Sequence, residues 1–123
     1  MIDHMSTYAT DYAATRAFYE AVLPPLGYDL LMEFPDMCAF GPPGQPIFWV
    51  IAVKEPATPR HIAFAAADRE SVARFHHVGE RQGGRDNGPP GLRPEYHEHY
   101  YGAFLLDPDG NNVEAVCHQP EEQ

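Results

Sequence analysis

The chain has 123 residues, with 8 Lys and Arg against 18 Asp and Glu, and its formal net charge is −10. This acidity argues against nucleic acid and anionic membrane surfaces as partners. No basic segment precedes an apolar one at the N-terminus, and no apolar run reaches the length of a membrane span, so we expect a cytoplasmic protein. The length suffices for one domain, or for two small modules that share a core.

The first half of the chain predicts a strand, a helix and three further strands. Residues 1–9 form the first strand, and Thr10 or Asp11 can cap the helix that follows. The apolar side of this helix carries Ala14, Phe18 and Val22. Between residues 28 and 53 a strand-like alternation is interrupted by two turn signals. We therefore predict one βαβββ module over residues 1–54.

The same pattern then starts again. Three pairs of residues stand 57 positions apart without a gap: His4 and His61, Asp11 and Asp68, and Phe18 and Phe75. Near the C-terminus the offset becomes 66, with Phe48 equivalent to Glu114, so the second copy is nine residues longer. The gain falls in residues 85–98, which we predict to be a functional Gly/Pro-rich loop. This internal repeat predicts a second βαβββ module over residues 59–118.

A turn followed by a strand closes the second module. In residues 107–116, Pro108 fixes its backbone angle and Gly110 supplies a positive one, so a tight turn is expected. Glu114 then stands among apolar, strand-forming residues. An ionised carboxylate is costly to bury without a cation or a metal ion beside it. Glu114 therefore needs a partner, unless it faces solvent on an edge strand.

Two histidines could hold a metal ion together with Glu114. His4 and His61 occupy equivalent positions in the first strands of the two modules, so a two-fold arrangement of the modules would bring them together. Glu114 lies on the last strand of the second module. Two imidazoles and one carboxylate hold a divalent ion and leave positions open, and Fe, Mn, Ni and Zn all accept this set. The alternative is that each is an ordinary strand histidine.

Other histidines and tyrosines offer candidate catalytic groups. Residues 96–101 lead into a predicted strand, where alternation places His97, His99 and Tyr101 on one face. A His or Tyr above the metal could serve as general acid or base. The alternative is a solvated loop with aromatic packing. The His76-His77 pair is predicted to lie on the surface of the second helix.

Four segments carry a resemblance to a known family. They are Ile2-Asp3-His4-Met5, the helix from Ala14 to Glu20, His61-Ile62-Ala63-Phe64, and the stretch from Asp107 to Glu114. With them the chain resembles the vicinal oxygen chelate superfamily, which groups glyoxalases, bleomycin resistance proteins and extradiol dioxygenases. The resemblance implies an α+β fold in a single domain, residues 1–123, whose two βαβββ modules form a cupped, barrel-like mixed sheet. It also implies a homodimer with a metal ion in the cup, and His4, His61 and Glu114 match the metal positions.

One position departs from the glyoxalase I pattern. Members of that type use a fourth ligand, a Glu on the last strand of the first module, where this chain has Phe48 or Trp49. The departure argues against lactoylglutathione lyase activity. We predict that these two aromatic residues line the substrate pocket as an apolar wall, with core filling as the alternative.

Two functional classes remain open. The first is a metal-dependent enzyme of lyase or dioxygenase type, in which two vicinal oxygens of a small substrate chelate the ion. A catechol-like, compact aromatic or keto-enol substrate is favoured. The second is a non-catalytic antibiotic-binding protein of the bleomycin resistance type, in which an acidic groove captures a cationic planar ligand. The acidity suits the second class, and the intact set of three ligands suits the first.

Overall fold

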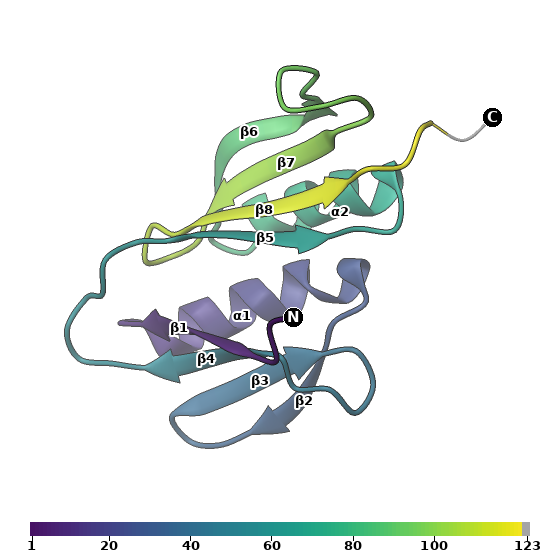
Figure 1. The fold of residues 1–123 in the computed structure, drawn as a ribbon. Helices are drawn as coiled ribbons and strands as arrows, with labels where there is room; N and C mark the ends of the chain where they lie inside the picture. Colours follow the sequence, from purple (N-terminus) through teal and green to yellow (C-terminus); the bar gives the residue numbers. More distant parts are fainter. Residues whose placement is uncertain (122–123) are drawn as a thin grey trace.

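The computed structural model describes residues 1–121 and confirms two βαβββ modules in an α+β fold (Figure 1). The elements are β1 (Met5–Ala9), α1 (Tyr12–Val22), a short 3-10 helix η1 (Pro24–Leu26), β2 (Asp29–Glu33), β3 (Met37–Gly41), β4 (Phe48–Ala52), β5 (His61–Ala65), α2 (Arg69–Glu80), β6 (Arg85–Leu92), β7 (Tyr101–Leu106) and β8 (Asn112–Cys117). Each module forms its own mixed sheet, in the orders β1-β4-β3-β2 and β5-β8-β7-β6. The two sheets are not closed into a barrel within the chain. No helix in this described part is long and apolar enough to cross a membrane.

Equivalent aspartates start the two helices. Asp11 accepts a hydrogen bond from the Ala14 amide at 3.1 Å, and Asp68 accepts one from the Ser71 amide at 2.7 Å. An aspartate at this position satisfies an amide that has no partner within the helix. Of the two predicted candidates, Thr10 and Asp11, Asp11 is the cap of α1, and Asp68, its partner 57 residues on in the repeat, caps α2.

The buried side of α1 differs from the prediction. It consists of Thr15, Phe18, Tyr19 and Val22, while Ala14 is exposed. Tyr19 can be buried because its hydroxyl donates a hydrogen bond to Asp107 at 2.6 Å. Burial and the carboxylate of Asp107 raise the pKa of this phenol well above its ordinary value, so it remains a donor. A large aromatic side chain with a satisfied hydroxyl buries more apolar area than the alanine would.

Phe48 joins the two modules in one core. Its ring centroid lies 5.0 Å from that of Tyr19 on α1 and 5.2 Å from that of Phe64 on β5, both in edge-to-face geometry. Only 1% of the residue is exposed. Figure 1 shows α1 and α2 together behind the two sheets, with β1 and β5 at the edges that face each other. The modules therefore share an aromatic core, and within residues 1–121 no strand of one sheet pairs with a strand of the other.

The predicted turn after β7 also connects the modules. Gly110 has φ +87°, as a tight turn requires, and its amide bonds to the Asp107 carbonyl at 2.9 Å. Asp109 accepts hydrogen bonds from the Thr10 amide and hydroxyl at 3.2 and 2.9 Å. Asn111 accepts one from the Arg60 amide at 2.8 Å. One turn thus fixes the start of α1 and the approach to β5.

Residues 85–92 form a strand, although we predicted a loop there. This strand, β6, pairs with β7 across register shifts near Gly88 and between Gly88 and Gly91. Proline is tolerated at this place because β6 is an edge strand and leaves one side unpaired. The remaining loop closes where the Arg93 amide donates to the Tyr100 carbonyl at 2.7 Å.

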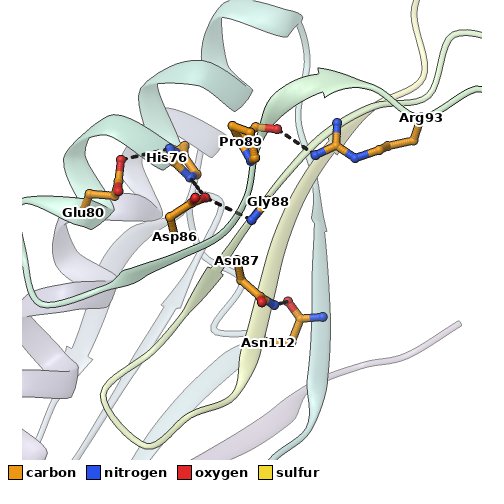
Figure 2. A network of polar contacts seen from close by, with 8 residues as sticks. All are labelled: His76, Glu80, Asp86, Asn87, Gly88, Pro89, Arg93 and Asn112. Atoms are coloured by element: carbon orange, nitrogen blue, oxygen red, sulfur yellow. Dashed lines mark hydrogen bonds and ion pairs between the residues drawn. The ribbon is translucent and has the colours of Figure 1, made fainter.

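His76 is buried, although we predicted that it would lie on the surface. Its Nε2 lies 2.8 Å from an Asp86 oxygen, and its Nδ1 lies 3.3 Å from a Glu80 oxygen. Asp86 also accepts a hydrogen bond from the Gly88 amide at 3.0 Å (Figure 2). Strand β6 covers this side of α2, and the contact between the imidazole and Asp86 links the two elements.

We expect Asp86→Asn to weaken this connection and to change how stability depends on pH. The bonds from the Gly88 amide and from His76 lower the pKa of the Asp86 carboxyl below its ordinary value. A carboxyl with a lower pKa in the folded state stabilises the fold above its unfolded pKa, and this contribution disappears as the pH falls through the folded pKa. Urea unfolding at neutral pH and below about pH 4 should show that Asp86→Asn costs stability at neutral pH and little in acid.

Glu55→Gln is the matched control, because Glu55 is exposed in the connector between the modules. It should leave the pH dependence unchanged. Equal stability losses for Asp86→Asn at both pH values would contradict the expected role of this carboxylate.

Candidate active site

The candidate site lies on the face of the second sheet that points away from the helices. Strand β5 alternates, with Ile62 and Phe64 in the core and His61 and Ala63 on the other face. In the parallel β5–β8 pair, Ala63 stands opposite Glu114. Glu114 therefore shares the face of His61, while its neighbours along β8 belong to the core.

Glu114 is 1% exposed, whereas His61 and Ala63 on the same face are exposed. One carboxylate oxygen lies 2.8 Å from Nε2 of His61. The other accepts a hydrogen bond from the hydroxyl of Tyr100. The expectation that a buried Glu114 needs partners is confirmed, with an imidazole on one oxygen and a phenol on the other. Burial and the contact with Glu114 raise the pKa of Tyr100 well above its ordinary value, so the phenol stays a donor.

Two backbone features bring Tyr100 over Glu114. His99 adopts a left-handed conformation with φ +62°, which is uncommon for a residue with a side chain and turns the chain before β7. Gly102 supplies the space, since a Cβ there would lie 3.1 Å from Cε1 of Tyr100 and 3.4 Å from Oε2 of Glu114. The packing of the phenol on the carboxylate thus depends on a glycine.

His4 does not join this pair within the chain. It precedes β1, its side chain is 60% exposed, and its Nδ1 lies 2.7 Å from Asp3. Among residues 1–121 no three His, Cys, Asp or Glu side chains are close enough to hold one ion. The adjacent imidazole and buried carboxylate of His61 and Glu114 fit a divalent cation chemically, but one chain brings together only two of the three predicted donors.

Comparison with known proteins identifies the family. The family model of the Glyoxalase/Bleomycin resistance protein/Dioxygenase superfamily matches residues 1–115. The chain belongs to this superfamily. No curated protein matches the sequence.

Solved structures of the superfamily share the fold. A glyoxalase/bleomycin resistance protein from Albidiferax ferrireducens T118 is 29% identical, covers 95% of this chain and 97% of its own, and has a TM-score of 0.80. A glyoxalase/dioxygenase from Nostoc punctiforme is 24% identical over 98% and 92% of the two chains, with a TM-score of 0.71. A lactoylglutathione lyase from Agrobacterium tumefaciens is 21% identical over 95% and 92%, with a TM-score of 0.68. At these last two identities the likeness concerns the fold alone.

The strand register distinguishes Trp49 from Phe48. Ser6 and Ala63 are equivalent in the repeat, and they stand opposite Trp49 and Glu114, respectively. Trp49 is therefore the counterpart of Glu114 in the first module and lies in a surface hollow beside His4. Phe48 belongs to the core, although one edge contributes to a small apolar pocket between the modules.

The three predicted catalytic residues, His97, His99 and Tyr101, lie in different environments. His97 stacks on His118 with ring centroids 4.7 Å apart and lies 5.1 Å from the Tyr100 ring. His99 is exposed, with Nε2 3.3 Å from Glu98. Tyr101 stands opposite Cys117, so it lies on the core face of the sheet, away from Glu114.

Sequence reasoning did not select Tyr100, whose hydroxyl donates a hydrogen bond to Glu114. Strand β7 begins only at Tyr101, so strand alternation cannot be extended back through His97 and His99. The pairing of Phe104 with Glu114 places Gly102, and Tyr100 one step before the strand, on the face of Glu114. The pairing of β7 with β8 was the signal that could have identified it.

Proposed function

We propose that this superfamily member is a metal-dependent enzyme acting on a small oxygenated substrate, with His61 and Glu114 as two of the metal ligands. The buried carboxylate of Glu114 is the observation that carries this proposal. It is held between an imidazole nitrogen and a phenol on the sheet face opposite the hydrophobic core, so it contributes nothing to the packing of that core. A hydrogen-bonded partner such as Tyr100 commonly orients a ligating carboxylate.

The third ligand would be His4 of a second copy of the chain. His4 is exposed at the start of the first module, and the sheets of a single chain do not close around it. A homodimer in which the first module of one subunit meets the second module of the other would assemble His4, His61 and Glu114. The choice among Fe, Mn, Ni and Zn stays open for this ligand set.

The metal ion, when bound, would polarise two vicinal substrate oxygens and stabilise the negative charge that develops on them. Tyr100 would keep one oxygen of Glu114 occupied and so direct the other toward the ion. His97, which is exposed and packs against the Tyr100 ring, would exchange a proton with the substrate. His99 is also on this loop, whereas Tyr101 would need a change of the strand to reach the site. Trp49 would supply the apolar wall.

A second candidate function is metal-free capture of a cationic antibiotic. The formal charge of −10 favours it, because an acidic surface attracts cationic ligands. The proposed His4, His61 and Glu114 set would then have no use, and the metal content of the protein separates the two functions.

The metal test compares the purified protein with His61→Ala. We expect one tightly bound divalent ion per chain in the parent. Loss of His61 should weaken affinity by more than the ~100-fold that loss of an outer hydrogen-bond partner can cost. Affinity in the parent should fall with decreasing pH, because imidazole must be deprotonated to bind metal. Elemental analysis and competition with a chelator measure both effects.

His77→Ala is the matched control, because His77 is an exposed histidine on α2. It should keep the parent's metal. Equally tight metal in His61→Ala would refute the proposed site, and a metal-free parent that binds cationic planar drugs would favour the second function. Rapid conversion of methylglyoxal and glutathione would refute the expectation that this is not a lactoylglutathione lyase.

A further inference from the structure

Arg93 places a guanidinium on the same sheet face as Glu114. It follows β6 directly, and its amide bonds to the carbonyl of Tyr100, so the two residues extend the β6–β7 pairing by one step. Residues opposite each other in an antiparallel pair project to the same face. The guanidinium carbon lies 5.5 Å from the centre of the Phe104 ring, and Phe104 stands opposite Glu114.

Phe104 connects Arg93 to His61. The Phe104 and His61 rings have centroids 6.3 Å apart. The cation therefore borders the same small region as the imidazole, the carboxylate and the phenol.

Two glycines of β6 leave room for this guanidinium. A Cβ on Gly91 would lie 3.1 Å from Nη1 of Arg93, and a Cβ on Gly88 would lie 3.3 Å from Nη2. Between them the Pro89 carbonyl accepts a hydrogen bond from Nη2 at 2.7 Å (Figure 2). The Gly88-Pro89-Pro90-Gly91 segment, which belongs to the nine-residue gain of the second module, thus forms a cradle that fixes the orientation of Arg93.

The guanidinium keeps most of its hydrogen-bonding capacity. It has five N–H donors, and the bond to Pro89 uses one of them. Within residues 1–121 it forms no ion pair, although acidic side chains outnumber basic ones more than two to one. Glu114, the buried acid on this face, is bound by His61 and Tyr100 instead. An oriented cation that has no acidic partner among the described residues is suited to an anion from outside.

We propose that Arg93 is the specificity-determining residue of the site and that it binds a carboxylate of the substrate. The inference rests on the proposed function and narrows its substrate class to small molecules that carry a carboxylate as well as two vicinal oxygens. A planar guanidinium binds carboxylates through parallel hydrogen bonds, which orient the ligand as well as attract it. The Phe104 ring beneath the guanidinium favours a flat, compact substrate body.

The test measures binding of catechol and of protocatechuate, which is catechol bearing a carboxylate. Calorimetry is done on the protein as purified and again with Zn(II) added, which avoids redox turnover. We expect the parent to bind protocatechuate about tenfold or more tightly than catechol, as a charge-assisted hydrogen bond provides. Arg93→Ala and Arg93→Gln should lose this preference and leave catechol affinity unchanged.

Arg81→Ala is the control, because Arg81 is exposed at the end of α2, and it should retain the preference. Thermal unfolding and circular dichroism confirm that each variant is folded. An equal preference for protocatechuate in the parent and both Arg93 variants would overturn the inference, as would no preference or no saturable binding in the parent.

Metal content measured on the same samples tests the proposed function separately. A metal-loaded protein without an Arg93-dependent preference refutes only this inference, and a metal-free protein with that preference refutes only the metal-dependent function.

Discussion

Phe48→Glu is expected to leave the chain unfolded at room temperature, whereas Trp49→Glu, one residue away, should keep the fold. The Phe48 ring lies in edge-to-face contact with Tyr19 and Phe64 and fills the core shared by the modules. Removing a buried aromatic side chain costs about 3–5 kcal/mol, and an unpaired buried carboxylate adds to that cost. The total stability of a domain is only about 5–15 kcal/mol.

Trp49 projects from the opposite face of β4 and is partly exposed, so a carboxylate there remains hydrated. We expect a loss of less than about 2 kcal/mol. Circular dichroism and urea unfolding measure both variants, with Phe48→Leu as an apolar control that should fold. A folded Phe48→Glu protein of parental stability would contradict the role of Phe48 in joining the modules. Because Trp49 is the counterpart of Glu114, Trp49→Glu should also alter metal preference.

The features that sequence alone predicted are those with local signals. The two aspartate caps and the turn at Gly110 depend on residues within a few positions of each other, and the structure has all of them. The 57-residue repeat predicted two equivalent modules because each copy must build the same strand–helix unit. His61 and Glu114 were predicted to belong to one site from the first and last strands of the second module, and these two strands pair in the structure.

The features that sequence did not predict depend on tertiary contacts. Prolines in β6 indicated a loop, but an edge strand accepts them because one side needs no partners. His76 was assigned to the surface because nothing in the helix itself shows that β6 covers that side. Tyr100 was not predicted because alternation divides residues 96–101 between two faces without showing that Phe104, and with it Tyr100, shares the face of Glu114. In each case a neighbouring strand decided the outcome.

A metal site that disappears in two variants should reappear when the variants are combined. His4→Ala and Glu114→Gln proteins are each expected to lose the ion, since each removes one proposed ligand. Glu114→Gln retains the shape of the side chain and an acceptor for Tyr100, which protects the local packing. Joined in one dimer, the two chains would form one site with both substitutions and one site with none.

The expected metal content of this mixed dimer is therefore half that of the parent dimer. Two different affinity tags allow the mixed dimer to be purified after unfolding and refolding the variants together, and elemental analysis measures its metal. A mixed dimer of two Glu114→Gln chains, carrying the same pair of tags, is the control and should stay empty. If each site were built within one chain, every site of the mixed dimer would carry one substitution and no metal would return. The result thus decides whether His4 meets His61 and Glu114 across subunits.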